Sequence, residues 1–164
     1  MKFASTIVMI LSIASFFEAA FAMPSLAPRW RLNHKWSEID RMPRHRAVMT
    51  AGVPEPYLSM RNPLPASTAT INRGAIVYAR NCVSCHGAIG EGNGPGGRNL
   101  SPLPADLAWL SWMKISQSDG FMYWTIAEGG TPFATPMPPF KDKLPAEDIW
   151  ALTTFIQAHL VQKR

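Results

Sequence analysis

Two cysteines and a histidine share one run of five residues, Cys82-Val83-Ser84-Cys85-His86. Two thiols three positions apart, followed at once by a histidine, form the attachment signature of a c-type haem. The thiols add to the two vinyl groups of the porphyrin, so both must face one edge of the ring. The histidine then lies under the ring and offers a nitrogen to the iron. The run therefore predicts one covalently attached haem c, held through Cys82 and Cys85, with His86 as an axial ligand.

Other interpretations of the two thiols need features that the chain lacks. A redox-active disulfide of this spacing is typical of a strand-to-helix context in a βαβ pattern, and no such pattern is present. A zinc site needs two further thiols or histidines at suitable spacing, and the chain has only two cysteines. Several glycines follow between Gly87 and Gly97, but a phosphate-binding loop requires a preceding strand. We interpret this stretch as a loop.

The N-terminus carries the features of an export signal. Lys2 precedes an apolar run from Ile7 to Phe17, and Ala20-Phe21-Ala22 has the small-x-small form of a cleavage site. We predict a signal peptide over residues 1–22, cleaved after Ala22. The run is shorter than the roughly 20 apolar residues that cross a bilayer, although an uncleaved anchor is the alternative. Export suits the haem motif, because c-type haem is attached outside the bacterial cytoplasm, so we expect a periplasmic protein.

Positive charge is concentrated after the predicted signal peptide. Residues 23–66 hold seven basic and three acidic residues, which is +4 of the net +5 of the chain, and seven of its fifteen prolines. This composition predicts a basic, loop-rich extension, with room for a short helix around residues 37–42. Two roles remain open for it. It docks to an acidic partner or an anionic membrane face, or it covers apolar surface of the following domain.

From residue 67 onward the pattern becomes helical, and no alternating strand pattern appears. Thr68 can cap a first helix, whose apolar face would comprise Ile71, Ala75, Tyr78 and Cys82. A short helical stretch follows Asp106, and a further helix over 119–128 ends at Gly129-Gly130. Pro145 fits the first turn of a last helix, with an apolar face of Ile149, Leu152, Ile156 and Leu160. We predict an all-α domain over residues 67–164.

Residues 67–164 resemble a monohaem class I cytochrome c. The matching features are Gly74 and Tyr78 in the leading helix, the run from Cys82 to Gly87, Met137-Pro138-Pro139-Phe140, and Ile149-Trp150-Ala151-Leu152 in the closing helix. The resemblance implies a bundle of three to five helices around the haem. It also implies that the first and last helices cross, with Gly74 allowing Trp150 or a neighbour to approach closely. The extension lies outside this family pattern.

The sequence also offers a distal ligand. Met137 lies among prolines that fix a loop without backbone donors, whereas Met113 and Met122 lie on helical stretches and are typical of core filling. We therefore predict iron ligation by His86 and Met137. In the family a proline carbonyl orients the proximal histidine, which points to Pro95 or, alternatively, Pro102.

Several other side chains have a haem-related interpretation and a plainer one. The aromatic residues that wall the haem pocket or fill the core would be Trp109, Trp112, Phe121, Trp124 and Phe140. Arg98 either pairs with a haem propionate or is a solvated loop arginine. His45 and Met49 could take part in a copper site, but local packing and surface charge are commoner roles for such a pair.

These predictions together describe an electron carrier and not an enzyme. Both axial positions of the iron would be filled, so no substrate binds the metal, and partners would be other redox proteins in small, transient contacts. We expect no nucleic-acid partner. Two alternatives remain: the cytochrome subunit of a larger dehydrogenase or oxidase complex, which the basic extension favours, and a haem enzyme or sensor with an open distal position.

Overall fold

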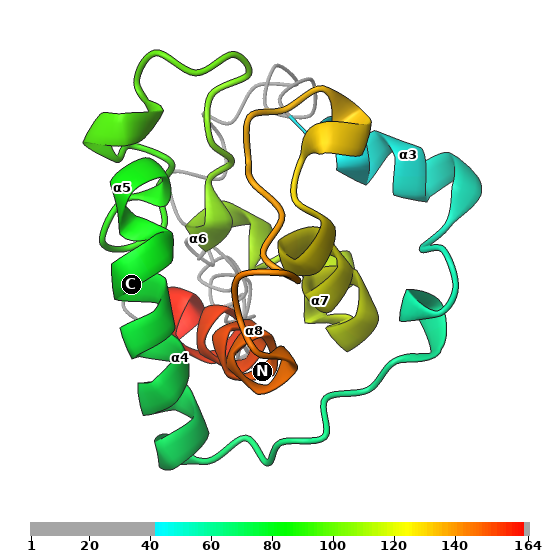
Figure 1. The fold of residues 1–164 in the computed structure, drawn as a ribbon, viewed down its shortest axis with the longest axis vertical. Helices are drawn as coiled ribbons and strands as arrows, with labels where there is room; N and C mark the ends of the chain where they lie inside the picture. The colour runs from blue at the N-terminus through cyan, green and yellow to red at the C-terminus, as the bar shows by residue number, and fades with distance from the viewer. Residues whose placement is uncertain (1–41, 163–164) are drawn as a thin grey trace, which may run out of the picture.

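The computed structural model describes residues 42–162. This part of the chain contains α-helices, short 3-10 helices and no strand, which confirms the all-α prediction (Figure 1). The predicted domain from residue 67 holds five α-helices up to residue 162, and one more lies between residues 42 and 66. The α-helices are α3 (Pro43–Ala51), α4 (Thr68–Asn81), α5 (Val83–His86), α6 (Leu107–Leu110), α7 (Asp119–Glu128) and α8 (Ala146–Gln162). The 3-10 helices are η1 (Tyr57–Ser59), η2 (Pro95–Gly97), η3 (Lys114–Gln117) and η4 (Thr131–Phe133).

Helix α4 leads directly to the cysteines. Its N-cap is Ser67, whose side chain accepts a hydrogen bond from the backbone N–H of Thr70, so the prediction of Thr68 as cap was one residue too late. The buried stripe consists of Thr70, Gly74, Val77 and Tyr78. The predicted face is therefore rotated slightly, because Ile71 and Ala75 are only partly buried. Cys82 ends α4 and precedes α5, so both thiols are held at the end of a long packed helix.

Helices α4 and α8 form the main packing unit, with α8 passing behind α4 in Figure 1. Ile149, Leu152 and Ile156 on α8 are buried in the same core as Val77 and Tyr78, as the helical spacing predicted. The side chain of Leu160 lies outside the described residues. A Cβ added at Gly74 would lie 2.1 Å from the carbonyl oxygen of Ala151. The neighbours that approach Gly74 are thus Ala151 and Phe155, rather than Trp150.

We expect Gly74→Val to destabilise the protein by about 3 kcal/mol or more, because the added atoms meet backbone that cannot move aside cheaply. The control is Ala79→Val, which places the same isopropyl side chain at an exposed position of α4. Thermal unfolding of the two variants checks the expectation. Equal melting temperatures would show that the two helices do not cross at this glycine.

Part of the predicted loop-rich extension is helical. Helix α3 begins with Pro43 at its first position and ends at Gly52, which has a φ of +76°. The sequence prediction missed it, because its buried face is formed by Arg44, His45 and Val48 and shows no apolar periodicity. The short helix expected around residues 37–42 lies almost entirely outside the described residues.

The described part of the extension covers the domain. Val48 belongs to the main hydrophobic core, and Val53 and Tyr57 pack against it. The Tyr57 hydroxyl also donates a hydrogen bond to the Glu128 carboxylate at the end of α7. These contacts favour the covering role for residues 42–66. In the part of the chain that the structure describes, no helix is both long and apolar enough to cross a membrane.

Candidate functional site

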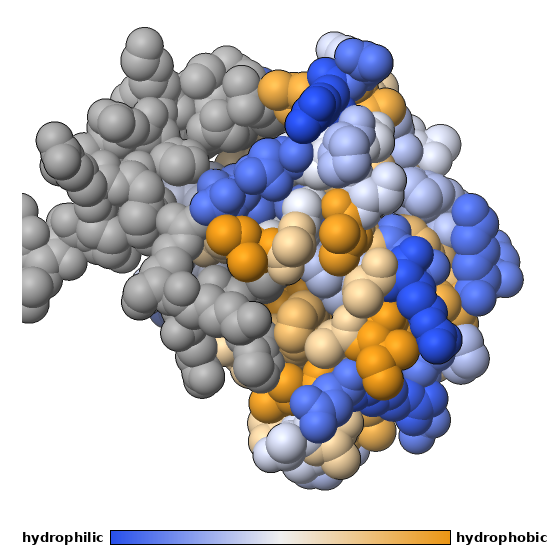
Figure 2. Space-filling view, turned by 90° about the vertical axis from the view of Figure 1, so that its left-hand side faces the viewer, coloured by the Kyte–Doolittle hydropathy of each residue, from blue (hydrophilic) through white to orange (hydrophobic). Residues whose placement is uncertain are grey.

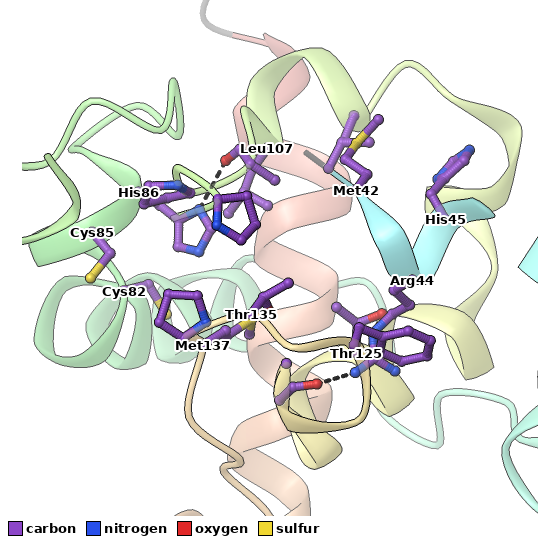
Figure 3. A pocket seen from close by; sticks show the side chains of 18 of the residues that line it. Met42, Arg44, His45, Cys82, Cys85, His86, Leu107, Thr125, Thr135 and Met137 are labelled. Carbon is purple, nitrogen blue, oxygen red and sulfur yellow. Dashed lines mark hydrogen bonds between the residues drawn. The ribbon is translucent and has the colours of Figure 1, made fainter. Parts of the chain in front are cut away.

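One cavity of about 180 Å³ brings together all four residues that the sequence nominated for the haem. Cys82, Cys85 and His86 reach it from the α4–α5 junction, and Met137 reaches it from the segment between η4 and α8. Figure 3 shows the two cysteines at one end of this pocket, with His86 above and Met137 below in that view. The apolar part of the wall includes Leu107, Leu110, Phe121, Phe140 and Ile156.

Backbone hydrogen bonds from the glycine-rich loop hold the cysteine–histidine run in place. The N–H groups of Gly90, Gly92 and Gly94 donate to the carbonyls of Gly87, His86 and Cys85, respectively. These N–H groups are therefore used within the protein and are not directed at a phosphate. This agrees with the interpretation of the stretch as an ordinary loop. Tyr78 on α4 also stabilises this turn, because its buried hydroxyl donates a hydrogen bond to the Gly87 carbonyl at 2.8 Å.

The Cys82 thiol is deeply buried, and Cys85 is less so. Burial and the neighbouring Cys85 raise the pKa of Cys82 to about 12, so that this thiol stays protonated at neutral pH. A neutral thiol in an apolar wall is stable without a counter-charge.

The structure determines the tautomer of His86. Its Nδ1 lies 3.0 Å from the carbonyl oxygen of Ala105, which can only accept a hydrogen bond. Nδ1 therefore carries the proton, and the lone pair remains on Nε2. Burial lowers the pKa of His86, partly opposed by the Ala105 carbonyl, so the ring is neutral at pH 7.

The sequence prediction of the carbonyl that orients His86 was wrong. Neither Pro95 nor Pro102 is the partner, since the acceptor is Ala105. The segment that contains Ala105 packs against the glycine-rich loop. A hydrogen bond from the Ala108 N–H to the Gly90 carbonyl, at 3.1 Å, joins the two segments. The prediction took a proline from the family pattern. In this protein the packing of the segment around Ala105 decides which carbonyl reaches His86.

The loop that carries Met137 is anchored on both sides. The Met137 carbonyl accepts from the Gly130 N–H at 2.7 Å, and the Phe140 N–H donates to the last turn of α7. A side chain at Gly129, where φ is +61°, would lie 2.4 Å from the Pro138 backbone. This close approach seats the loop against the end of α7.

Two other methionines also line the cavity. They are Met122, from the middle of α7, and Met42, which precedes α3 and was not considered from the sequence. Met42 lies in the upper part of the view in Figure 3, as does His86, whereas Met137 lies below. Met113 is not among the residues that line the cavity.

Arg44 and His45 are cavity residues that the sequence reasoning missed. Both line the pocket, and each is only 8% exposed. Arg98, the arginine considered for a propionate, is exposed and does not line it. Met49 is 74% exposed while His45 is buried, so the two do not form a copper site. Among the described residues there is also no group of three or more metal-ligating His, Cys, Asp or Glu side chains.

The aromatic residues divide into two groups. Phe121 and Phe140 are buried and line the cavity, and Trp124 is buried in the core next to it. Trp112 is 44% exposed, and neither it nor Trp109 lines the cavity. The expectation of a common wall or core therefore fails for Trp112, which lies in the exposed turn between α6 and η3.

The chemistry of the cavity fits a haem c. Two thiols lie at one end, a neutral imidazole with a free Nε2 lone pair lies on the wall, and a thioether comes from a separate segment. Apolar side chains line most of the remainder, and the buried Arg44 and His45 lie at the end opposite the cysteines in Figure 3. A porphyrin needs each of these features: two attachment points, axial donors, apolar walls and partners for its two carboxylates.

Comparisons with known proteins agree with this chemistry. Residues 69–156 match the protein family described as cytochrome c oxidase, cbb3-type, subunit III. A solved chain of the reducing HAO-like protein complex of Kuenenia stuttgartiensis is 29% identical, with a TM-score of 0.52. That match covers 71% of this chain and 55% of the other, so the protein corresponds to about half of that chain. A search of curated proteins gave no match. The helical fold, the donor set of the cavity and the family match over more than half of its length show that this chain belongs to the monohaem cytochrome c family, whose members bind haem c covalently and transfer electrons.

Proposed function

We propose that the protein is an exported electron carrier with a single haem c, attached through Cys82 and Cys85 and ligated by His86 and Met137. The observation that carries this proposal is the convergence of these four side chains on one cavity from two segments about 50 residues apart in the chain. Bound haem supplies a one-electron couple between ferric and ferrous iron.

The roles of the protein side chains follow from their surroundings. His86 presents Nε2 because the Ala105 carbonyl holds the proton on Nδ1. Met137 offers a soft, weak thioether donor, which favours ferrous iron and therefore raises the reduction potential. Phe121, Phe140 and Ile156 line the cavity, so they would keep water away from a bound haem, which would also raise the reduction potential. With His86 and Met137 as its ligands, a bound haem would favour electron transfer over substrate chemistry.

Electrons need a path from the cavity to the surface. Leu103 lines the cavity and is 37% exposed, so the wall reaches solvent at this residue. Large apolar residues are also exposed at Ile76 and Ile89. Figure 2, which shows the side of the molecule that carries α4 and α5, has hydrophobic residues interspersed with hydrophilic ones. A mixed surface of this kind suits small, short-lived contacts with redox partners.

A second candidate function is a subunit of a larger redox complex. The observation that favours it is the similarity to a chain that belongs to a protein complex in Kuenenia stuttgartiensis. The basic residues before α3 are the feature of the sequence that would serve a stable partner or an anionic membrane face. Purification of the native protein under mild conditions separates the two functions, because a free carrier elutes alone and a subunit elutes with its partner.

Ligation and export are tested on the full-length protein expressed with haem-maturation enzymes. We expect covalent haem in the periplasmic fraction, on a chain that begins at Met23, and ferrous protein that does not bind added carbon monoxide. Mass spectrometry, haem staining and absorption spectra provide these three measurements. Rapid binding of carbon monoxide by the wild-type protein would contradict the carrier and favour an open distal position.

A further inference from the structure

Three buried polar atoms lack a hydrogen-bond partner among residues 42–162 and belong to residues that line the cavity. They are Nη1 of Arg44, Nδ1 of His45 and the hydroxyl oxygen of Ser116. A buried polar group without a partner is costly, so native proteins normally pair such groups. Their location on one cavity therefore indicates that a ligand bound there carries polar groups.

Arg44 makes the strongest case, because it is a buried cation. Its guanidinium lies 4.0 Å from the centre of the Trp124 ring and 4.6 Å from that of Phe133, and its Nη2 donates to the Gly129 carbonyl. These contacts fix the guanidinium while leaving Nη1 unused. No ion pair joins Arg44 to a carboxylate of the described residues. Glu128 acts on the charge of Arg44 without forming a salt bridge with it, so Nη1 of this buried cation remains available to an anion in the cavity.

The position of Arg44 fits the far edge of a haem. The vinyl groups that react with the cysteines lie on one edge of the porphyrin, and the two propionates lie on the opposite edge. In Figure 3 the cysteines are at one end of the pocket, and Arg44 and His45 are at the other. A porphyrin attached at the cysteines would therefore direct its carboxylates toward the end of the pocket that holds Arg44.

We infer that Arg44 binds a haem propionate as its charge partner. This inference rests on the proposed haem attachment and adds to it. Helix α3 lies outside residues 69–156, the part of the chain that matches the family. The extension therefore supplies part of the haem site of this protein, in addition to covering apolar surface.

The test uses the full-length holoprotein and the variant Arg44→Gln. A positive charge near the haem disfavours the ferric state, so its loss favours oxidation. We expect the ratio of oxidised to reduced protein, at a fixed solution potential, to rise about tenfold, which corresponds to a potential lower by about 59 mV. The matched control is Arg46→Gln, which removes the same charge from an exposed position of α3. We expect its potential to stay near that of the wild type.

A purely structural role predicts a different result. If Arg44 only clamps Trp124 and Phe133, Arg44→Gln lowers the melting temperature but has the same potential as Arg46→Gln, and the inference is wrong. Haem staining separates this failure from failure of the proposed function, because the inference applies only where haem remains covalently bound in the wild type and the variant.

A second measurement decides the question if Arg44→Gln does not fold. Arg44→Lys keeps the charge but replaces the planar donor group, so the hydrogen bond to the propionate changes. We expect the propionate bending vibration in the resonance Raman spectrum to shift in Arg44→Lys and not in Arg46→Lys. An unchanged vibration in Arg44→Lys would overturn the inference.

Discussion

The double variant Cys82→Ala/Cys85→Ala is expected to contain no covalently bound haem. Both thiols lie at one end of the cavity, and the chain has no other cysteine to replace them. Cys85→Ala alone should also lose stably bound haem, since one of the two vinyl groups on that edge of the porphyrin then has no thiol to react with. Haem staining after denaturing electrophoresis measures this loss directly, because only covalently attached haem remains with the chain.

The same variants should fold poorly. A group that binds only the native state stabilises that state. Without the haem, the apolar cavity of this small domain is left unfilled and the domain loses this stabilisation. Ser84→Ala is the matched control, since Ser84 lies between the cysteines but is exposed. It should keep its haem and its melting temperature. A well-folded Cys85→Ala protein with normal haem content would contradict the attachment that we propose.

The variant Met137→Ala is expected to lower the reduction potential and to open the iron to added ligands. Axial ligands set haem potentials over a range of about 0.8 V, so removal of a thioether should shift the potential by roughly a tenth or more of that range. The vacant position should then bind carbon monoxide in the ferrous state. Potentiometric titration and ligand-binding spectra measure the two effects.

The controls are the other methionines of the cavity, Met42→Ala and Met122→Ala. They remove a similar volume from the wall but should leave the axial ligand in place, so carbon monoxide binding should remain weak. If Met42→Ala or Met122→Ala opens the iron and Met137→Ala does not, the distal ligand has been assigned to the wrong residue.

The sequence alone predicted the helical fold, the haem and the four residues nominated to hold it. These predictions depend on local features. The spacing from Cys82 to His86 follows from the size of a porphyrin edge, and α7 is bounded by Ser118 before it and Gly129 after it. Such signals need only a few neighbouring residues, so they can be recognised in a chain whose packing is unknown.

The tertiary structure decided which groups surround the predicted site. The Ala105 carbonyl meets His86 across 19 positions of the chain, and Arg44 reaches Gly129 across 85. Helix α3 buries an arginine and a histidine, so its buried face has the polar residue types that are normally found on an exposed face. No local pattern predicts such contacts, because they depend on how separate segments pack. The nature of the cofactor follows from adjacent residues, whereas its environment is assembled from distant ones, each held in place by the core.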